Sequence, residues 1–95
     1  MSVQALVGID VGTSGVKVVV TDTEGQRLAE GSQRYPLATD GTGAEQDPMS
    51  WWRAVTDVCS QVIGSHRAHA VAVTSQAPTL VPIDADGSPT YAALT

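Results

Sequence analysis

The sequence predicts an α/β fold in which a mixed sheet combines an antiparallel β-hairpin, a crossover helix and a parallel strand. Two short apolar runs, 5–9 and 16–20, flank a turn rich in glycine and hydroxyl groups and are too short for independent helices. A helical apolar pattern follows over 48–63, and the later run 70–74 is apolar on both faces, which is typical of a strand covered on both sides. A right-handed crossover would return this strand beside the first, and parallel to it.

Composition limits the class of protein. The chain has 95 residues, which is about the length of one domain. Its formal net charge of −5 and its 4% aromatic residues make it unlike a nucleic-acid-binding protein, which needs basic and aromatic side chains. No apolar run approaches the roughly 20 residues of a membrane span, and we see no signal-peptide pattern, so the expected compartment is the cytoplasm. The single cysteine, Cys59, excludes an internal disulfide, and His66 and His69 lack ligand partners at metal-binding spacing.

The turn between the two apolar runs has the chemistry of an anion site. Gly12 and Gly15 allow positive φ angles that would direct backbone N–H groups toward a common point. Thr13 and Ser14 add hydroxyl donors, and Lys17 adds a cation just past the turn. We therefore expect a phosphate as the occupant, although an ordinary hairpin turn explains the same residues about as well when the turn is taken alone.

Asp10 points to a metal beside that phosphate. Its carboxylate would repel a phosphate by about 4 kcal/mol at a 4 Å separation and an effective dielectric near 20, unless a cation lies between them. Mg²⁺ is the usual cation, which predicts a metal–nucleotide site with Asp10 holding the metal directly or through water. The P-loop and the G-x-G-x-x-G motif are excluded, because their glycine spacing is absent and a strand rather than a helix follows the turn.

The next elements are a turn, an edge strand and a loop. Asp22 can accept from the backbone ahead of it, and Gly25 can take the left-handed conformation that closes the turn 22–26. The segment 27–35 alternates imperfectly, which is typical of an exposed antiparallel edge strand. Proline, two glycines and an aspartate in 36–43 predict a loop.

The helix has clear end signals. Asp47 is a good N-cap, Pro48 fits the first helical position, and Gly64 ends the helix. Its predicted buried face includes both tryptophans, which we expect in the core rather than on a ligand platform. The residues of this face and its flank are Trp51, Val55, Val58 and Val62, with Trp52, Cys59 and Ile63 beside them.

The carboxyl ends of the two parallel strands carry polar side chains. Asp10 ends one of them and Ser75 with Gln76 follow the other, so we expect them to open onto the same crevice. The segment 80–83 predicts a further, weakly pairing strand because it contains a proline. Residues 84–88 after it predict an acidic turn rather than a calcium loop, because later acidic ligands are missing.

Three segments together resemble the FGGY carbohydrate kinases of the actin/hexokinase/Hsp70 superfamily, which implies part of a ribonuclease H-like (actin-like ATPase) domain. The first segment is shared across the superfamily, whereas the second and third, at this spacing, point to FGGY. The segments are Gly8-Ile9-Asp10-Val11-Gly12-Thr13-Ser14-Gly15-Val16-Lys17, then Glu45-Gln46-Asp47-Pro48 with Trp51-Trp52, and then Val73-Thr74-Ser75-Gln76 leading to Leu80-Val81-Pro82-Ile83-Asp84.

The resemblance implies ATP-dependent transfer of a phosphoryl group to a hydroxyl of a sugar or polyol. Asp10 corresponds to the family's magnesium-associated aspartate, so ATP and Mg²⁺ are the implied cofactors. The residues similar to its first phosphate motif are Gly12, Thr13, Ser14 and Lys17. Residues 1–95 correspond to the opening part of the first of two lobes, and the family's general base lies beyond Thr95. We therefore expect this chain alone to be inactive, and a homodimer is the oligomer that we consider for the full-length protein.

The acceptor sugar stays open. Relatives resembling xylulokinase carry Gln-Met-His-Gly after the parallel strand and glycerol kinases carry an Arg-Glu pair, whereas this chain has Gln76-Ala77-Pro78-Thr79. Gln76 can offer its amide to sugar hydroxyls or brace the loop. On the whole the sequence is closer to the xylulokinase side.

Two other functions remain open. The first is an actin-like-fold ATPase or sugar-responsive regulator without sugar kinase activity, which the residues beyond Thr95 would distinguish. The second is a stand-alone, non-catalytic binding or assembly module, which predicts a chain that folds stably by itself. If 71–74 is an interior strand, we instead expect the isolated chain to be marginally stable or prone to aggregation.

Overall fold

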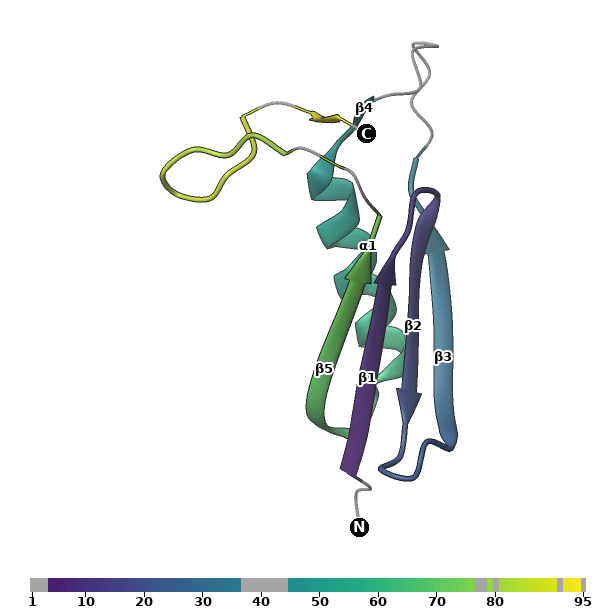
Figure 1. The fold of residues 1–95 in the computed structure, drawn as a ribbon. Coiled ribbons are helices and arrows are strands. Elements are labelled where there is room, and N and C mark those ends of the chain that lie inside the picture. Colours follow the sequence, from purple (N-terminus) through teal and green to yellow (C-terminus); the bar gives the residue numbers. More distant parts are fainter. Residues whose placement is uncertain (1–3, 37–44, 77–78, 80, 91, 95) are drawn as a thin grey trace.

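The described residues form a four-stranded mixed sheet with a helix packed on one face (Figure 1), and a second, two-stranded sheet. The computed structural model describes residues 4–36, 45–76, 79, 81–90 and 92–94. The sheet has the order β3-β2-β1-β5, in which β1 pairs antiparallel with β2 and parallel with β5, and β2 pairs antiparallel with β3. The bounds are β1 Gln4–Val11, β2 Gly15–Thr21, β3 Arg27–Arg34 and β5 Arg67–Ser75. The predicted hairpin, edge strand and parallel strand are confirmed.

The helix α1, Pro48–Val62, connects β3 to β5 across the sheet and packs mainly against β2 and β3. Side chains alternate along each strand, so one face of β1 and β2 lies under α1. The core fills this space with small and β-branched side chains, which pack well on a pleated surface. The buried cluster consists of Ala5, Val7, Val16, Val18, Val20, Tyr35, Ala54 and Val58.

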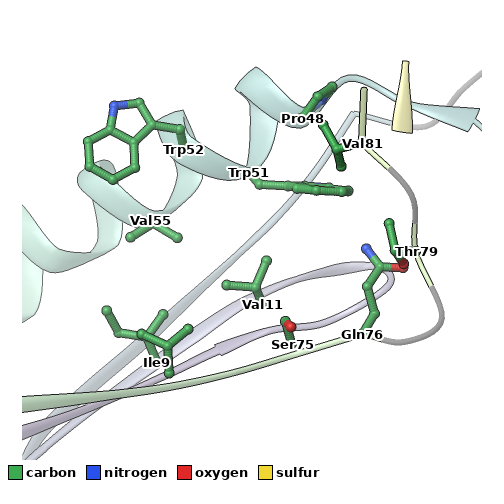
Figure 2. Close-up of a pocket in the computed structure, with 11 residues that line it drawn as sticks. Ile9, Val11, Pro48, Trp51, Trp52, Val55, Ser75, Gln76, Thr79 and Val81 are labelled. Atoms are coloured by element: carbon green, nitrogen blue, oxygen red, sulfur yellow. The ribbon is translucent and has the colours of Figure 1, made fainter. Parts of the chain in front are cut away.

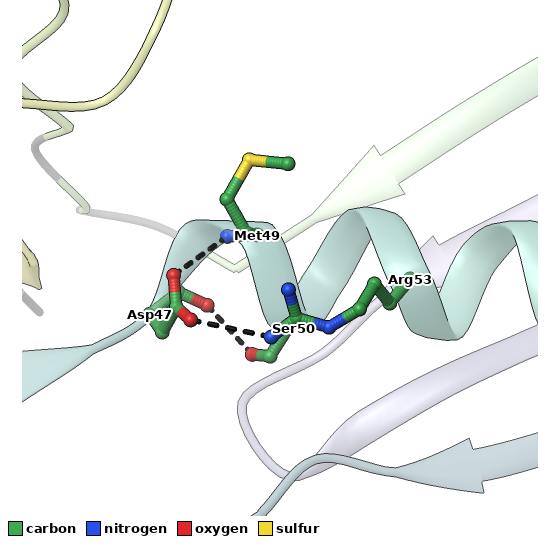
Figure 3. A network of polar contacts seen from close by, with 4 residues as sticks. All are labelled: Asp47, Met49, Ser50 and Arg53. Atoms are coloured by element: carbon green, nitrogen blue, oxygen red, sulfur yellow. Dashed lines mark hydrogen bonds and ion pairs between the residues drawn. The ribbon is translucent and has the colours of Figure 1, made fainter.

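The start of α1 follows its sequence signals (Figure 3). The Asp47 carboxylate accepts from the Met49 N–H at 3.0 Å, and the Asp47 carbonyl accepts from the Ser50 hydroxyl at 2.6 Å. The first of these bonds satisfies one of the N–H groups that a helix start leaves unpaired. Arg53 adds an exposed ion pair to Asp47 at 3.3 Å, and Gly64 ends the helix at a φ of +54°.

The two predicted acidic turns are also confirmed. Asp22 Oδ1 accepts from the N–H groups of residues 24 and 26, each at 2.9 Å, and Gly25 has a φ of +87°. Asp84 repeats this arrangement with residues 86 and 88, and Gly87 has a φ of +82°. The strand predicted before this second turn is wrong for its described residues 81–83, because only an isolated bridge from Ile83 to Pro89 forms there.

Two burial predictions are corrected. Trp51 is half-buried and packs against the core, but Trp52 is 63% exposed, because the helix turns it away from the sheet (Figure 2). Strand β5 was expected to be covered on both sides, yet all nine of its residues are exposed and Val73 is 64% exposed. It forms the edge of the sheet and has little contact with α1.

One small element was not predicted. Strand β4, Glu45–Gln46, pairs antiparallel with β6, Ala93–Leu94, and so fixes the segment that leads into α1. The predicted loop 36–43 lies, apart from Pro36, outside the described residues. Among the described residues, no helix is long and apolar enough to cross a membrane.

Candidate functional site

The tip of the β1–β2 hairpin lies at the carboxyl end of β1, next to the end of β5 (Figure 1). Asp10 pairs with Lys17 across the hairpin and with Thr74 on β5. Paired residues share a face, so these three side chains lie on the face opposite to the one that α1 covers. They line a shallow hollow of about 340 Å³. The structure thus brings together Asp10 and Lys17, which the sequence proposed for the metal and the phosphates.

The glycines of the tip work differently from the prediction. Neither Gly12 nor Gly15 has a positive φ, so the expected left-handed turn is wrong. Both glycines instead allow other backbone segments to approach closely. A Cβ on Gly12 would lie 3.2 Å from the Gly15 carbonyl oxygen, and one on Gly15 only 2.5 Å from the Gln33 carbonyl oxygen. The Gly12 N–H donates to the Gly15 carbonyl at 2.9 Å and closes the tip.

Four successive carbonyls of the tip accept hydrogen bonds from the protein. The donors come from three separate segments of the chain, namely the end of β3, strand β4 and the end of β5. The pairs are the Val11 carbonyl with the Gln76 N–H at 2.9 Å, Gly12 with Gln76 Nε2 at 3.5 Å, Thr13 with Gln46 Nε2 at 2.7 Å, and Ser14 with the Tyr35 N–H at 3.1 Å.

This bonding orients the backbone N–H groups of the tip. In a trans peptide the C=O and the following N–H point in opposite directions. Because the Gly12 and Thr13 carbonyls point at Gln76 and Gln46, the N–H groups of Thr13 and Ser14 point away from these partners. Within the described part of the chain no acceptor lies at either N–H. The hydroxyl-bearing tip therefore presents N–H donors that no described residue uses and that can bind an anion.

The charges around the tip are mostly exposed. Lys17 Nζ lies 3.9 Å from Glu30 Oε2, which is closer to Arg27 at 3.1 Å. This contact is long and solvent-exposed, so it holds Lys17 only weakly. Tyr35 is buried, and burial raises the pKa of its hydroxyl, with the negative charge of Asp10 as a smaller cause.

Gln76 lies on the other face of the sheet, in a second hollow of about 550 Å³ (Figure 2). Apolar side chains line most of it, among them Val11, Trp51 and Val55, and Ser75 also faces it. The expectation that Asp10 and Ser75–Gln76 share one crevice is therefore wrong: Ser75 pairs with Val11, one residue past Asp10, and side chains alternate between faces.

Asp10 can hold a magnesium ion whose other ligands are mostly water molecules and phosphate oxygens. Its side chain is exposed, and no described residue donates to its carboxylate or forms an ion pair with it. Mg²⁺ at phosphates is commonly held by one or two carboxylates. Among the described residues no group of three His, Cys, Asp or Glu could form an all-protein metal site. Cys59 is half-buried, and burial raises the pKa of its thiol.

Sequence reasoning missed three contributors to this region. In the sequence Gln46 is one residue of a motif, Tyr35 is the last residue of a predicted strand, and Thr79 lies in the segment after the parallel strand. Tyr35 and Thr79 each have a buried hydroxyl oxygen without a partner among the described residues. No local pattern could have assigned the Gln46 contact, because its partner Thr13 lies 33 positions away.

Comparison with known sequences decides the family. The N-terminal domain of the FGGY family of carbohydrate kinases matches residues 5–95. The chain belongs to this family. A xylulose kinase from Streptomyces coelicolor is 38% identical over 90 residues, which covers 94% of this chain and 19% of that protein. A glycerol kinase from Aquifex aeolicus is 35% identical over 97 residues, again 94% of this chain and 19% of the relative.

Solved structures of FGGY kinases share the fold. A gluconate kinase from Lactobacillus acidophilus superimposes with a TM-score of 0.85 at 28% identity, over 99% of this chain and 20% of that one. The part-domain of the actin-like ATPase fold inferred from the sequence is therefore confirmed. The chain spans about one fifth of the length of the relatives it matches.

Proposed function

We propose that the protein carrying this chain transfers the γ-phosphoryl group of ATP to a hydroxyl of a sugar or polyol. The observation that carries the proposal is the hairpin tip, whose carbonyls are bonded to the protein and whose Thr13 and Ser14 N–H groups have no acceptor among the described residues. The FGGY membership and the names of the relatives, which are xylulose, glycerol and gluconate kinases, support the reaction class.

In this function each residue of the tip has a role. The N–H groups and hydroxyls of Thr13 and Ser14 bind phosphate oxygens, and Gly12 allows the phosphates to approach the backbone. Lys17 offsets phosphate charge, and Asp10 holds Mg²⁺ directly or through water. When bound, this ion neutralises charge on the phosphates, which is most of what phosphoryl transfer requires of a protein. The general base belongs to a segment outside this chain.

Residues 1–95 are, in this proposal, the opening part of the first kinase lobe. Gln76 is proposed for the acceptor side, although in the structure its amide braces the hairpin tip and bonds to Gln46. The acceptor is a small sugar or polyol, with D-xylulose as the first candidate because xylulose kinases are among the relatives. We place the reaction in the cytoplasm.

The test uses the protein expressed from the complete reading frame that contains this chain. ADP formation from Mg·ATP is measured with D-xylulose, glycerol and gluconate in turn. We expect acceptor-dependent ADP formation, and a decrease of about 10- to 100-fold in kcat/KM for Asp10→Ala. Asp86→Ala, in an exposed turn remote from the tip (Figure 1), is the matched control and should retain wild-type activity.

Each failure has its own meaning. ADP formation that no sugar or polyol stimulates would favour the ATPase or regulator. A protein that binds no nucleotide at all would favour the non-catalytic module. Equal nucleotide affinity of wild type and Asp10→Ala, with Mg²⁺ present, would remove Asp10 from the metal role.

A further inference from the structure

Gln46 lies at the meeting point of three elements around the hairpin tip. Its Nε2 donates to the Thr13 carbonyl at 2.7 Å. Its Oε1 accepts from Trp51 Nε1, in the first turns of α1, at 3.1 Å and from Gln76 Nε2, just after β5, at 3.0 Å. One half-buried amide thus connects the helix, the parallel strand and the tip.

These partners allow only one orientation of the Gln46 amide. An indole N–H and a glutamine NH₂ can only donate, and a backbone carbonyl can only accept. The opposite orientation would place Oε1 against the Thr13 carbonyl oxygen and Nε2 against two donors. The Thr13 carbonyl and the Trp51 indole cannot change roles, so both of their hydrogen bonds would become unfavourable contacts, and the amide is fixed.

The backbone of Gln46 is held as firmly as its side chain. Gln46 pairs with Ala93 in the β4–β6 ladder, and the next residue, Asp47, caps α1. The side chain therefore extends from a fixed point onto the tip. This explains why a two-residue strand far from the hairpin in sequence belongs to the same structural unit.

We propose that Gln46 is a positioning residue that holds the Thr13 carbonyl inward and thereby keeps the Ser14 N–H directed at a bound phosphate. The Thr13 carbonyl and the Ser14 N–H belong to one planar peptide unit, so turning one turns the other. The Gln46 contact is the shortest of the four that hold the tip. The proposal rests on the proposed function only for the identity of the anion, the triphosphate of ATP.

Two substitutions separate the hydrogen bond from the shape of the side chain. Gln46→Met keeps the length but removes all three bonds. Gln46→Glu is nearly isosteric, and its ionised carboxylate still accepts from Trp51 and Gln76 but cannot donate to Thr13. Gln26→Glu makes the same chemical change in an exposed turn at the other end of the hairpin and is the matched control.

The measurement is the Kd for Mg·ATP of the protein from the complete reading frame, by calorimetry, with the KM for the acceptor sugar beside it. Loss of the hydrogen bond should raise the Kd about tenfold in Gln46→Met and, at about pH 8, in Gln46→Glu. The sugar KM should stay within about twofold, as should both constants in Gln26→Glu. A wild-type Kd in Gln46→Met, or an equal rise in the sugar KM, would overturn the proposal.

The Gln46→Glu variant also gives a pH signature that a merely structural role would not produce. A protonated carboxyl group can donate to the Thr13 carbonyl, whereas the ionised one cannot. The ratio of variant to wild-type Kd should therefore fall toward one as the pH falls from about 8 toward the ordinary pKa of a glutamate, about 4.3. The carboxyl groups of Asp10 and Asp47 are present in both proteins, so their effects on the Kd cancel in the ratio. A ratio that does not change with pH contradicts the proposal.

A further readout separates this inference from the proposed function. If the protein binds no nucleotide, the positioning role of Gln46 is tested by the backbone NMR signal of Ser14 and the indole N–H signal of Trp51. Both signals should move in Gln46→Met, whereas that of the exposed Trp52 indole should not. An unmoved Ser14 signal would show that Gln46 does not orient the tip.

Discussion

The packing of α1 on the sheet predicts opposite effects for the same substitution at two strand glycines. A Cβ on Gly31, in β3, would lie 2.7 Å from Val62 Cγ1 and 3.3 Å from Val58 Cγ1. A Cβ on Gly8, in β1, meets nothing within 4 Å. Neither glycine has a positive φ, so alanine can adopt both backbone conformations. The difference therefore lies in the space under the helix.

The magnitude follows from two opposing terms. Replacing a glycine by alanine in a compatible conformation stabilises a protein by about 0.4–1 kcal/mol, because the unfolded chain has less freedom to lose. Overpacking a well-filled contact costs about 1–3 kcal/mol, and valine cannot easily turn its methyls away because it is stiff at χ1. The first term is common to both sites. Gly31→Ala should therefore be about 1–3 kcal/mol less stable than Gly8→Ala, with Gly8→Ala at or above wild type.

The assay is urea unfolding of both variants without nucleotide, followed by circular dichroism. For a chain of this size each kcal/mol corresponds to about 4–8 °C in Tm, so thermal melts give an independent reading. The cost of the double variant Gly31→Ala/Val62→Ala should be smaller than the sum of the two single costs, because Val62→Ala removes the methyl group that the new Cβ meets. Equal stability of Gly31→Ala and Gly8→Ala would refute the packing argument.

Three more predictions follow from the structure. Tyr35→Phe should leave stability at pH 7 unchanged or raise it by up to about 1 kcal/mol, because the buried hydroxyl has no partner among the described residues. Since the folded state raises the pKa of Tyr35, the wild type should lose stability as the pH rises above about 10, and Tyr35→Phe should lose less. Urea unfolding of both proteins at pH 7 and above about pH 10 checks this. A Tyr35→Phe variant that is clearly less stable than the wild type at pH 7 would contradict it. Asp47→Ala should cost about 1 kcal/mol in thermal unfolding, whereas Asp47→Asn, which can still cap the helix, should cost only part of that. We expect the 95-residue chain alone to be marginally stable or to associate, and Val73→Lys on the exposed β5 edge should reduce that association in sedimentation velocity; unchanged association would exclude this edge as its cause.

The local elements could be predicted because their signals are short-range. Short apolar runs on either side of a glycine-rich turn define β1 and β2, and Asp47 with Pro48 defines the start of α1. The turns at Asp22 and Asp84 follow from side chains that bond to backbone two and four residues ahead. The parallel pairing of β5 with β1 follows from the handedness of the crossover.

Burial was harder to predict, because it depends on what lies opposite a residue. The periodicity of α1 places both tryptophans near the apolar face, but the sheet under the helix reaches only Trp51 and leaves Trp52 exposed. Val73 is apolar in sequence, yet β5 lies at the edge of the sheet. The hydrophobicity of a side chain shows only that it prefers to be buried. Whether another element covers it depends on how the helices and strands are arranged.

The sequence by itself determined the order of the four strands of the main sheet and the helix, and the FGGY resemblance, and it placed Asp10 and Lys17 together at the hairpin. Only the tertiary structure decided that Gly12 and Gly15 serve close approach, that Asp10 and Gln76 line different hollows, and that Gln46 holds the Thr13 carbonyl. The physical reason is range: turns, caps and strand patterns act over a few residues. A hydrogen bond between residues 33 positions apart exists only once the helix and both sheets have assembled.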